Sequence, residues 1–153
     1  MRNSRGFSIL ELMIALAVLA IMAAIAIPNY LGWREKRLLQ SSAVDVQMAI
    51  NLAKMTAIRE NMDVVLIFNR DNENYRAFID TDADGTQDAG ERTIRSKAMS
   101  TGIDLDRTDF ASDKLTFNSR GLASGSGDIT LINKSGDENR IVNVTITGMS
   151  RIN

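Results

Sequence analysis

Carboxylates recur at short, regular intervals between Asp80 and Glu91. Acids occupy positions one, three, five, nine and twelve of this twelve-residue segment, and Gly85 occupies position six. Calcium takes about six to eight oxygen ligands, and this spacing lets one loop curl around the ion. The segment therefore predicts a possible Ca²⁺ site, the one cofactor that the sequence suggests. Its candidate ligands are Asp80, Asp82, Asp84, Thr86 (through its carbonyl), Asp88 and Glu91.

Two features separate this segment from a calcium loop of the helix–loop–helix type. Gln87 stands at position eight, where an aliphatic residue is usual, and the flanking residues read as strands rather than helices. The alternative interpretation is an acidic hairpin loop that its charges keep soluble. Carboxylates this close together repel one another unless a cation or solvent screens them. Both interpretations stay open at the level of sequence.

The amino-acid composition argues against a catalytic function. Histidine and cysteine are absent from the 153 residues, which removes the usual Ser-His-Asp and Cys-His nucleophiles and any His or Cys zinc site. No glycine-rich phosphate-binding loop follows a plausible strand. The net charge of −1 gives no strong tendency to bind polyanions. We therefore expect a protein that is not an enzyme.

The beginning of the chain predicts a membrane-spanning helix with one acid in it. The apolar run from Phe7 to Ile27 corresponds to about 30 Å of helix, enough to cross a bilayer. Glu11 lies inside this run. A carboxylate within such a segment costs on the order of 3 kcal/mol, so it requires a partner. A helix that first lies in a membrane and later packs against copies of its own kind would meet both conditions.

Gly6-Phe7, Glu11, the apolar run, Pro28 and Tyr30 together resemble the amino terminus of type IV prepilins and type II secretion pseudopilins. The resemblance implies that a prepilin peptidase cuts between Gly6 and Phe7 and methylates the new terminus. Residues 1–6 would then be a leader and residues 7–29 a transmembrane and assembly helix that includes Pro28. It also implies that Glu11 governs assembly with other pilins or pseudopilins, by pairing with the amino terminus of a neighbouring subunit.

Two other interpretations of the same segment compete with this one. An ordinary secretory signal would use Arg2 and Arg5 as its charged end and Ala24–Ala26 as its cleavage site, but the apolar run is long and Glu11 interrupts it. A plain single-span anchor explains the length but not the glutamate. Basic residues flank the run on both sides, so charge alone does not orient it. An inner-membrane, single-pass orientation with a periplasmic carboxyl-terminal domain rests on the resemblance.

The helix is predicted to continue beyond the membrane, from about Ser8 to about Arg59. Apolar residues in its second half recur at spacings of four and three, which favours one amphipathic helix over residues 30–61 packed on its own domain. Pro28 should kink the helix or open its hydrogen-bond ladder, because proline has no N–H. The stripe consists of Leu39, Ala43, Val46, Ile50, Ala53 and Ala57.

Residues 62–153 are predicted to form a β domain, because β-branched and aromatic runs alternate there with turn-rich segments. Residues 100–112 read mostly as loop with a short strand at 103–105. The fold class is α+β, a long amino-terminal helix packed on an antiparallel sheet or β-sandwich, which is a pilin-like arrangement. Strands are expected at 64–68, 75–79, 92–97, 115–117, 129–132 and 141–146.

Two carboxyl-terminal segments extend the resemblance. Residues 117–122 run from a phenylalanine strand into a glycine turn, and residues 147–151 form a glycine-containing basic tail. Both are similar to the H-type pseudopilin and FimT-type minor pilin family. The resemblance implies a minor structural subunit of a type II secretion pseudopilus or a type IV pilus.

Two alternatives to the filament function remain. The first is a DNA-binding minor pilin that would use Lys134, Arg140 and Arg151. Acids lie among these three cations and useful affinity for phosphates needs several basic side chains, so a DNA partner is not expected. The second alternative is a membrane-anchored periplasmic binding domain with no filament role, which would show no prepilin processing.

Overall fold

The computed structural model describes residues 8–153, and the predicted leader with the Gly6–Phe7 cleavage site lies outside the described residues. The chain divides into two compact units, residues 1–35 and residues 36–153. The elements are α1 (Ile9–Glu60), β1 (Asp63–Asn69), β2 (Asn74–Asp80), β3 (Thr93–Ala98), β4 (Ile103–Thr108), a short 3-10 turn (Ala111–Asp113), β5 (Lys114–Phe117), β6 (Gly127–Asn133), β7 (Asn139–Val144) and β8 (Ser150–Ile152).

The first unit contains the amino-terminal part of α1. Ser8 caps this helix, because its side-chain oxygen accepts the Leu10 N–H at 3.3 Å and its carbonyl accepts the Leu12 N–H at 3.1 Å. Pro28 lies inside α1, which is assigned as helix on both sides of it. The predicted kink at Pro28 stays a prediction. Every residue from Ser8 to Glu35 is exposed.

The second unit begins with the remainder of α1, residues 36–60, and here the predicted stripe is confirmed. All six of its residues are completely buried. Their spacing places them on one face of the helix, and that face supplies the helical share of the hydrophobic core. Glu60 is the last residue of α1, and Asn61 follows in the left-handed conformation at φ +54°, which ends the helix.

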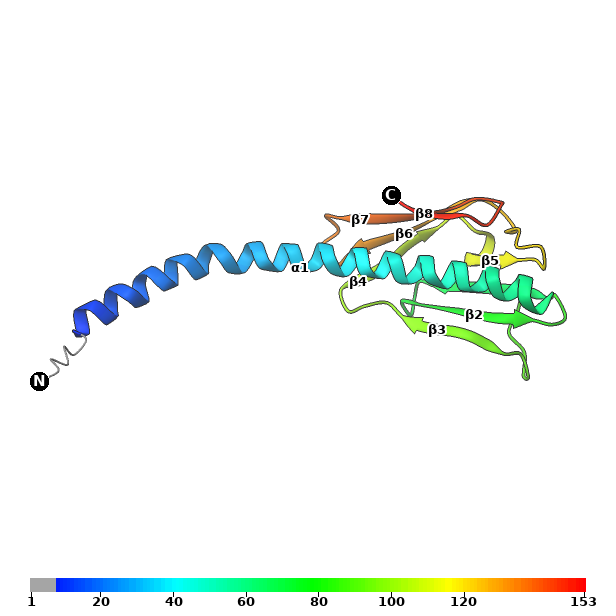
Figure 1. Ribbon diagram of the computed structural model, residues 1–153, viewed down its shortest axis with the longest axis horizontal. Coiled ribbons are helices and arrows are strands. Elements are labelled where there is room, and N and C mark those ends of the chain that lie inside the picture. Colours follow the sequence, from blue (N-terminus) through cyan, green and yellow to red (C-terminus); the bar gives the residue numbers. More distant parts are fainter. Residues whose placement is uncertain (1–7) are drawn as a thin grey trace, which may run out of the picture. The chain divides into compact units, whose positions relative to one another are not determined.

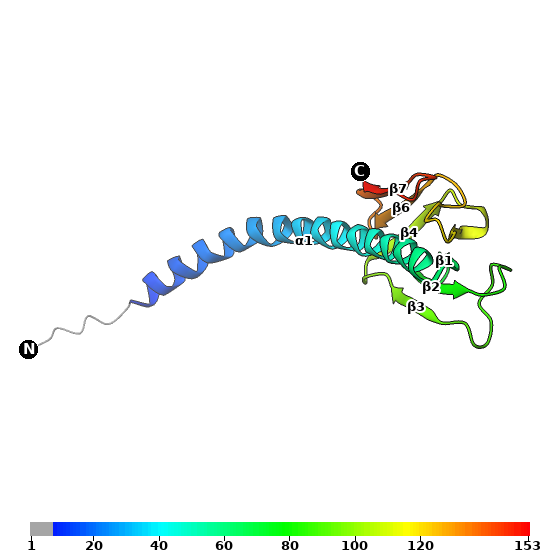
Figure 2. The ribbon, with the colours of Figure 1, turned by 45° about the vertical axis from the view of Figure 1, so that its right-hand side comes forward.

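The β domain consists of two four-stranded antiparallel sheets. One has the strand order β3-β2-β1-β5 and the other β4-β6-β7-β8. Figures 1 and 2 show the carboxyl-terminal part of α1 lying alongside both sheets. Hydrogen bonds from this helix reach both, since Gln47 donates to the Ser150 carbonyl of β8 and Tyr75 of β2 donates to the Asp45 carbonyl.

One continuous core lies between the helix and the two sheets. Val64 and Leu66 of β1, Phe117 of β5, and Ile129 and Leu131 of β6 are fully buried in it together with the helical stripe. The strands alternate buried and more exposed positions, as expected for sheets with one face on a core. The predicted α+β, pilin-like fold is therefore confirmed.

The structure corrects the sequence interpretation of residues 100–112. Residues 103–108 form the six-residue strand β4, not a three-residue strand in a loop. Ile103 and Leu105 point into the core, while Asp104 and Asp106 are exposed. The polar residues that suggested a loop are the solvent side of an edge strand, where charges discourage pairing with another chain.

The carboxyl terminus also differs from the expectation of a strand over 141–146 followed by a tail. Strand β7 ends at Val144, and the Gly148 N–H closes a turn by donating to the Thr145 carbonyl at 2.8 Å. Gly148 has φ +70°, and a Cβ at this position would lie 2.5 Å from the Gly121 carbonyl oxygen, so only glycine fits. The residues after the turn form β8 and pair with β7.

Candidate functional site

The amino-terminal part of α1 is one candidate functional surface. An 18-residue window of this helix has a mean hydropathy of 2.7, and none of the window is buried. Helix α1 is long and apolar enough to cross a membrane. Glu11 lies exposed in its first turn. A carboxylate there also suits the positive end of the helix dipole.

Two aromatic residues lie just after the apolar run, and the sequence interpretation used only the first of them, Tyr30. Tyr30 and Trp33 are one helical turn apart, their ring centroids are 6.1 Å apart, and both are more than half exposed. Amphipathic rings concentrate where a membrane-spanning segment meets water. The position of Trp33 next to Arg34, just after the apolar run, was the signal in the sequence that could have identified it.

The second half of α1 has an apolar face of its own on the side away from the core. Val44, Met48, Met55 and Ile58 are spaced by four, seven and three residues, which places them on one side of the helix. Between 38% and 67% of each of these residues is exposed. We call these four residues the outer face. An apolar row of this kind is typical of a surface that packs on a partner.

The acidic segment between β2 and β3, residues 80–91, is the second candidate site, and we call it the acidic loop. Asp80, Asp82 and Asp84 each place one carboxylate oxygen within 4.8 Å of the other two. Asp82 and Asp84 are exposed, whereas Asp80 is only 4% exposed. The structure thus brings together three of the six candidate ligands in one group that could hold a metal ion.

The carboxylate of Asp80 is held inside the acidic loop. Its Oδ2 accepts the Gly85 N–H at 2.9 Å, and Gly85 adopts φ +74° to present that group. Its Oδ1 is buried and has no hydrogen-bond partner among residues 8–153. Loss of water around the buried carboxyl raises the pKa of Asp80 above its ordinary value, and the charge of Glu91 adds to that effect.

The other candidate ligands shape the backbone of the acidic loop. Asp84 accepts the backbone N–H and the hydroxyl of Thr86, both at 2.6 Å, and these bonds lower the pKa of Asp84. Glu91 accepts the Thr81 N–H at 2.6 Å through Oε1 and the Asp88 N–H at 3.1 Å through Oε2, which lowers the pKa of Glu91. Glu91 thereby links the two ends of the loop. Asp88 is exposed.

Lys114 at the start of β5 is a residue of this site that the sequence interpretation missed. Its ammonium group donates to the Gly85 carbonyl at 2.6 Å, and its charge helps to lower the pKa of Asp84. It lies 29 positions from Gly85 in the sequence and reaches the loop only because β5 pairs with β1, which also pairs with β2. Spacing along the chain carries no signal for such a contact.

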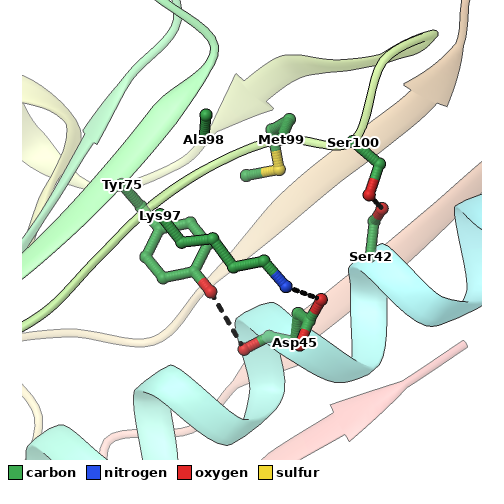
Figure 3. A pocket seen from close by; sticks show the side chains of 7 residues that line it. All are labelled: Ser42, Asp45, Tyr75, Lys97, Ala98, Met99 and Ser100. Atoms are coloured by element: carbon green, nitrogen blue, oxygen red, sulfur yellow. Dashed lines mark hydrogen bonds and ion pairs between the residues drawn. The ribbon is translucent and has the colours of Figure 1, made fainter.

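A shallow hollow between α1 and β3 is filled by charged side chains rather than open to a ligand. Figure 3 shows the Lys97 ammonium group pointing at the Asp45 carboxylate, with which it forms an ion pair. Arg95 lies 3.5 Å from the other oxygen of Asp45, and the Tyr75 hydroxyl donates to the Asp45 carbonyl at 3.3 Å. These contacts attach β2 and β3 to the helix.

The three cations of the DNA-binding alternative have different surroundings. Arg140 donates to the Gln40 side chain at 3.0 Å and to the Asn139 carbonyl at 2.7 Å. Lys134 and Arg151 are exposed, on the β6–β7 loop and on β8. The Glu138 carboxylate lies in the same loop as Lys134 and pairs with Lys36 at 2.7 Å. Acid is therefore interspersed with base at this edge of the domain.

The chain is similar to a pilin-like protein over nearly its whole length and to a pilus component over a shorter stretch. It is 26% identical to the pilin-like protein PilA1 of Thermus thermophilus, with 97% of each chain covered. It is also 50% identical over 36 residues to the type IV wide pilus major component PilA4 of the same organism, which covers 24% of this chain and 28% of PilA4.

Two solved structures share the fold. The minor pseudopilin EpsH of the Vibrio cholerae type 2 secretion system matches with a TM-score of 0.59 at 19% identity, covering 75% of this chain and 95% of EpsH. The type IV minor pilin FimU of Pseudomonas aeruginosa matches with a TM-score of 0.63 at 16% identity, covering 79% of this chain and 92% of FimU. At these identities the likeness concerns the fold.

Two family descriptions match the chain itself. The prokaryotic N-terminal methylation motif matches residues 1–27, the segment that contains Gly6, Phe7 and Glu11. The description "type II transport protein GspH" matches residues 42–149, from the middle of α1 to the turn before β8. This second match includes the acidic loop and most of both sheets, and it covers well over half of the chain. The chain therefore belongs to the GspH family of type II transport proteins.

Proposed function

We propose that this protein is a minor pilin-like subunit of a type II secretion pseudopilus or a type IV pilus, held in a membrane and assembled through α1. The observation that carries the proposal is the run from Ser8 to Glu35, an exposed helical segment with an apolar stretch on a chain of the GspH family. Such a surface requires lipid or neighbouring helices around it. The family is one of structural subunits, not enzymes.

The proposed maturation begins at the amino terminus. A prepilin peptidase removes residues 1–6 by cutting between Gly6 and Phe7, and the same enzyme methylates the amino group of Phe7. The match of the methylation motif to residues 1–27 supports this step. Residues 7–29 then form the transmembrane and assembly helix, residues 30–61 its amphipathic continuation, and residues 62–153 the periplasmic β domain.

The proposed location is the bacterial inner membrane, with one span and the β domain in the periplasm. Tyr30 and Trp33 would lie at the periplasmic surface of the inner membrane, because aromatic rings are favoured where a span meets water. The arrangement predicts that protease added to spheroplasts digests the β domain of the intact protein. Protection of the β domain until the membrane is dissolved would contradict it.

Glu11 has the central role in the proposed assembly. Its carboxylate is costly within a lipid-facing helix, and a positive partner offsets that cost. The amino group of the methylated Phe7 of a neighbouring subunit supplies such a charge. Pairing between neighbours also fixes their axial register, because a repeated head-to-tail contact between two different surfaces of the subunits generates a helical filament.

Two further features of α1 support assembly with other pilins. The outer face exposes Val44, Met48, Met55 and Ile58, which can pack against helices of neighbouring subunits. Pro28 leaves the Ala24 carbonyl without its usual helical donor, so the helix is easier to open near that point. Both features lie in the element that the proposal places at the centre of the filament.

The test compares three forms of the full chain in a host that assembles the filament. Glu11→Leu removes the carboxylate, whereas Glu11→Asp keeps it as a matched control. We expect both variants to fractionate with the membrane, and Glu11→Leu to be depleted from sheared filaments at least about tenfold, which corresponds to the loss of about 1.4 kcal/mol per contact. Glu11→Asp should retain more incorporation than Glu11→Leu. Equal incorporation of Glu11→Leu and the unchanged chain would contradict the role of Glu11.

A further inference from the structure

We propose that the acidic loop is a Ca²⁺ site in which Asp80, Asp82 and Asp84 supply carboxylate ligands around one ion. This inference goes beyond the filament function and does not depend on it. It rests on two separate observations: the convergence of three carboxylates and a buried oxygen of Asp80 that has no donor within the described part of the chain.

The three carboxylates are spaced as ligands of one ion would be. Calcium binds oxygens at about 2.3–2.6 Å, so oxygens that share an ion lie within about 5 Å of one another. The carboxylate oxygens of Asp80, Asp82 and Asp84 lie within 4.8 Å of one another. They belong to positions one, three and five of a twelve-residue loop, the positions that open a calcium loop. Three hard anionic oxygens favour Ca²⁺ or Mg²⁺ over transition metals.

The buried oxygen of Asp80 points to a cation more directly. Buried polar atoms in folded proteins nearly always have a partner, and an unpaired one calls for an explanation. Asp80 is only 4% exposed, Gly85 holds its Oδ2, and its Oδ1 has no hydrogen-bond partner among the described residues. One oxygen of this buried carboxylate therefore lacks a partner among residues 8–153, and the same carboxylate converges with those of Asp82 and Asp84. A bound cation would satisfy that oxygen and neutralise the group.

The remaining loop residues complete the site in the proposal. The twelve-position pattern assigns the Thr86 carbonyl, Asp88 and Glu91 to the later coordination positions. Glu91 lies close enough to Asp80 to raise its pKa, and it holds the backbone of Thr81 and Asp88 across the loop. Binding of the ion would exchange part of these hydrogen bonds for coordination, which lowers the affinity relative to a fully preformed site.

Lys114 sets the expected strength of the site. Its ammonium group binds the Gly85 carbonyl beside the carboxylates and is a resident positive charge that disfavours a second cation. We therefore expect a dissociation constant of about 10⁻⁴ to 10⁻³ M, the range of extracellular calcium modules. Replacing Lys114 with methionine keeps the side-chain length and removes the charge, so it should tighten calcium binding.

The experiment measures calcium binding by the full chain in detergent micelles at constant ionic strength. Isothermal titration with CaCl₂ follows removal of metal with EDTA, and titration with MgCl₂ serves as the comparison. Asp84→Asn removes an exposed ligand, Asp80→Asn removes the buried one, and Lys114→Met removes the competing cation. Asp106→Asn on β4 is the matched control, because it removes an exposed carboxylate outside the loop.

We expect one Ca²⁺ per chain and a melting temperature about 5–10 °C higher in roughly 10 mM calcium. Asp84→Asn should weaken binding about tenfold or more, Lys114→Met should strengthen it, and Asp106→Asn should leave it unchanged. In EDTA, Asp80→Asn should melt at or above the temperature of the unchanged chain, because it removes a buried negative charge.

Three results would overturn the proposal. The first is the absence of both heat and a thermal shift at millimolar calcium. The second is an equal loss of binding in Asp106→Asn and Asp84→Asn, which would indicate general attraction of cations to surface charge. The third is a fall in the melting temperature of Asp80→Asn that is the same in EDTA and in calcium, which would make this carboxylate a structural group with no ion.

Discussion

The two halves of α1 belong to one continuous helix but differ in how much of their surface is buried. Residues 9–35 expose every side chain, whereas residues 36–60 bury a stripe from Leu39 to Ala57 against two sheets of the same chain. Folding therefore covers the apolar stripe of the second half with the two sheets. No residue of the first half is buried, so its apolar surface requires lipid or other subunits. Assembly and folding thus use different stretches of a single element.

Truncation of the buried stripe should have the largest effect on folding. Ile50 is completely buried, and Ile50→Ala should lower the free energy of unfolding of the β domain by about 2–5 kcal/mol through lost burial and a cavity. Ile14→Ala in the first half is the matched control and should leave that free energy unchanged. Urea unfolding of both full-length variants in micelles, followed by near-ultraviolet circular dichroism, measures the difference. Similar losses of unfolding free energy in the two variants would contradict the claim that only the second half contributes to the folded core.

Asp45 on the second half should contribute less. Its carboxylate pairs with Lys97 and Arg95 of β3, and all three side chains keep some contact with water. Asp45→Ala should therefore destabilise the domain by about 1–2 kcal/mol, less than the loss of a buried isoleucine. The same urea experiment at raised salt tests the cause, since screening should reduce the difference between the variant and the unchanged chain. An effect that exceeds that of Ile50→Ala would indicate that polar contacts dominate the attachment of β3.

The outer face should affect assembly without affecting folding. Met48→Ser and Met55→Ser change exposed side chains, so the free energy of unfolding should shift by no more than about 0.5 kcal/mol. Incorporation into sheared filaments should fall, because these side chains pack on neighbouring subunits in the proposal. Lys134→Ser, an exposed change elsewhere in the same unit, is the control. Unchanged incorporation of both methionine variants would indicate that the outer face makes no assembly contacts and would contradict this prediction.

The Lys36–Glu138 pair should have the smallest effect, and that effect should disappear in acid. The ammonium group of Lys36 lowers the pKa of Glu138 below its ordinary value. A carboxyl whose pKa is lowered by folding adds stability above the pKa of the unfolded chain, about 4.3, and loses it as the pH falls through the lowered value. Glu138→Gln should therefore match the unchanged chain near pH 2 and melt slightly lower near pH 7. A difference that grows as the pH falls would contradict this assignment.

The sequence was most informative where a feature is local and periodic. The stripe from Leu39 to Ala57 follows from spacings of three and four, and all six of its residues are buried. The amino-terminal motif likewise lies within a short segment, and the methylation motif matches it. Both features depend on residues that are near one another along the chain.

The sequence was less informative where residues far apart meet. Strand β4 was interpreted largely as loop because Asp104 and Asp106 are polar, and only its pairing with β6 shows them to be the solvent side of an edge. The acidic loop was found by spacing, but the unpaired Oδ1 of Asp80 and the contact from Lys114 depend on the arrangement of β1, β2 and β5. Trp33 was missed because a single tryptophan indicates a membrane boundary only once its position relative to the end of the span is considered.

The mass of the mature amino terminus tests the central claim most directly. The claim is that the first half of α1 is a processed assembly helix, and its proposed processing site lies between Gly6 and Phe7. Intact-mass and peptide analysis of the protein purified from membranes should show a chain that starts at Phe7 and carries one methyl group on its amino nitrogen. A chain that retains residues 1–6, or one that begins at Ile27 after ordinary signal cleavage, would contradict the claim.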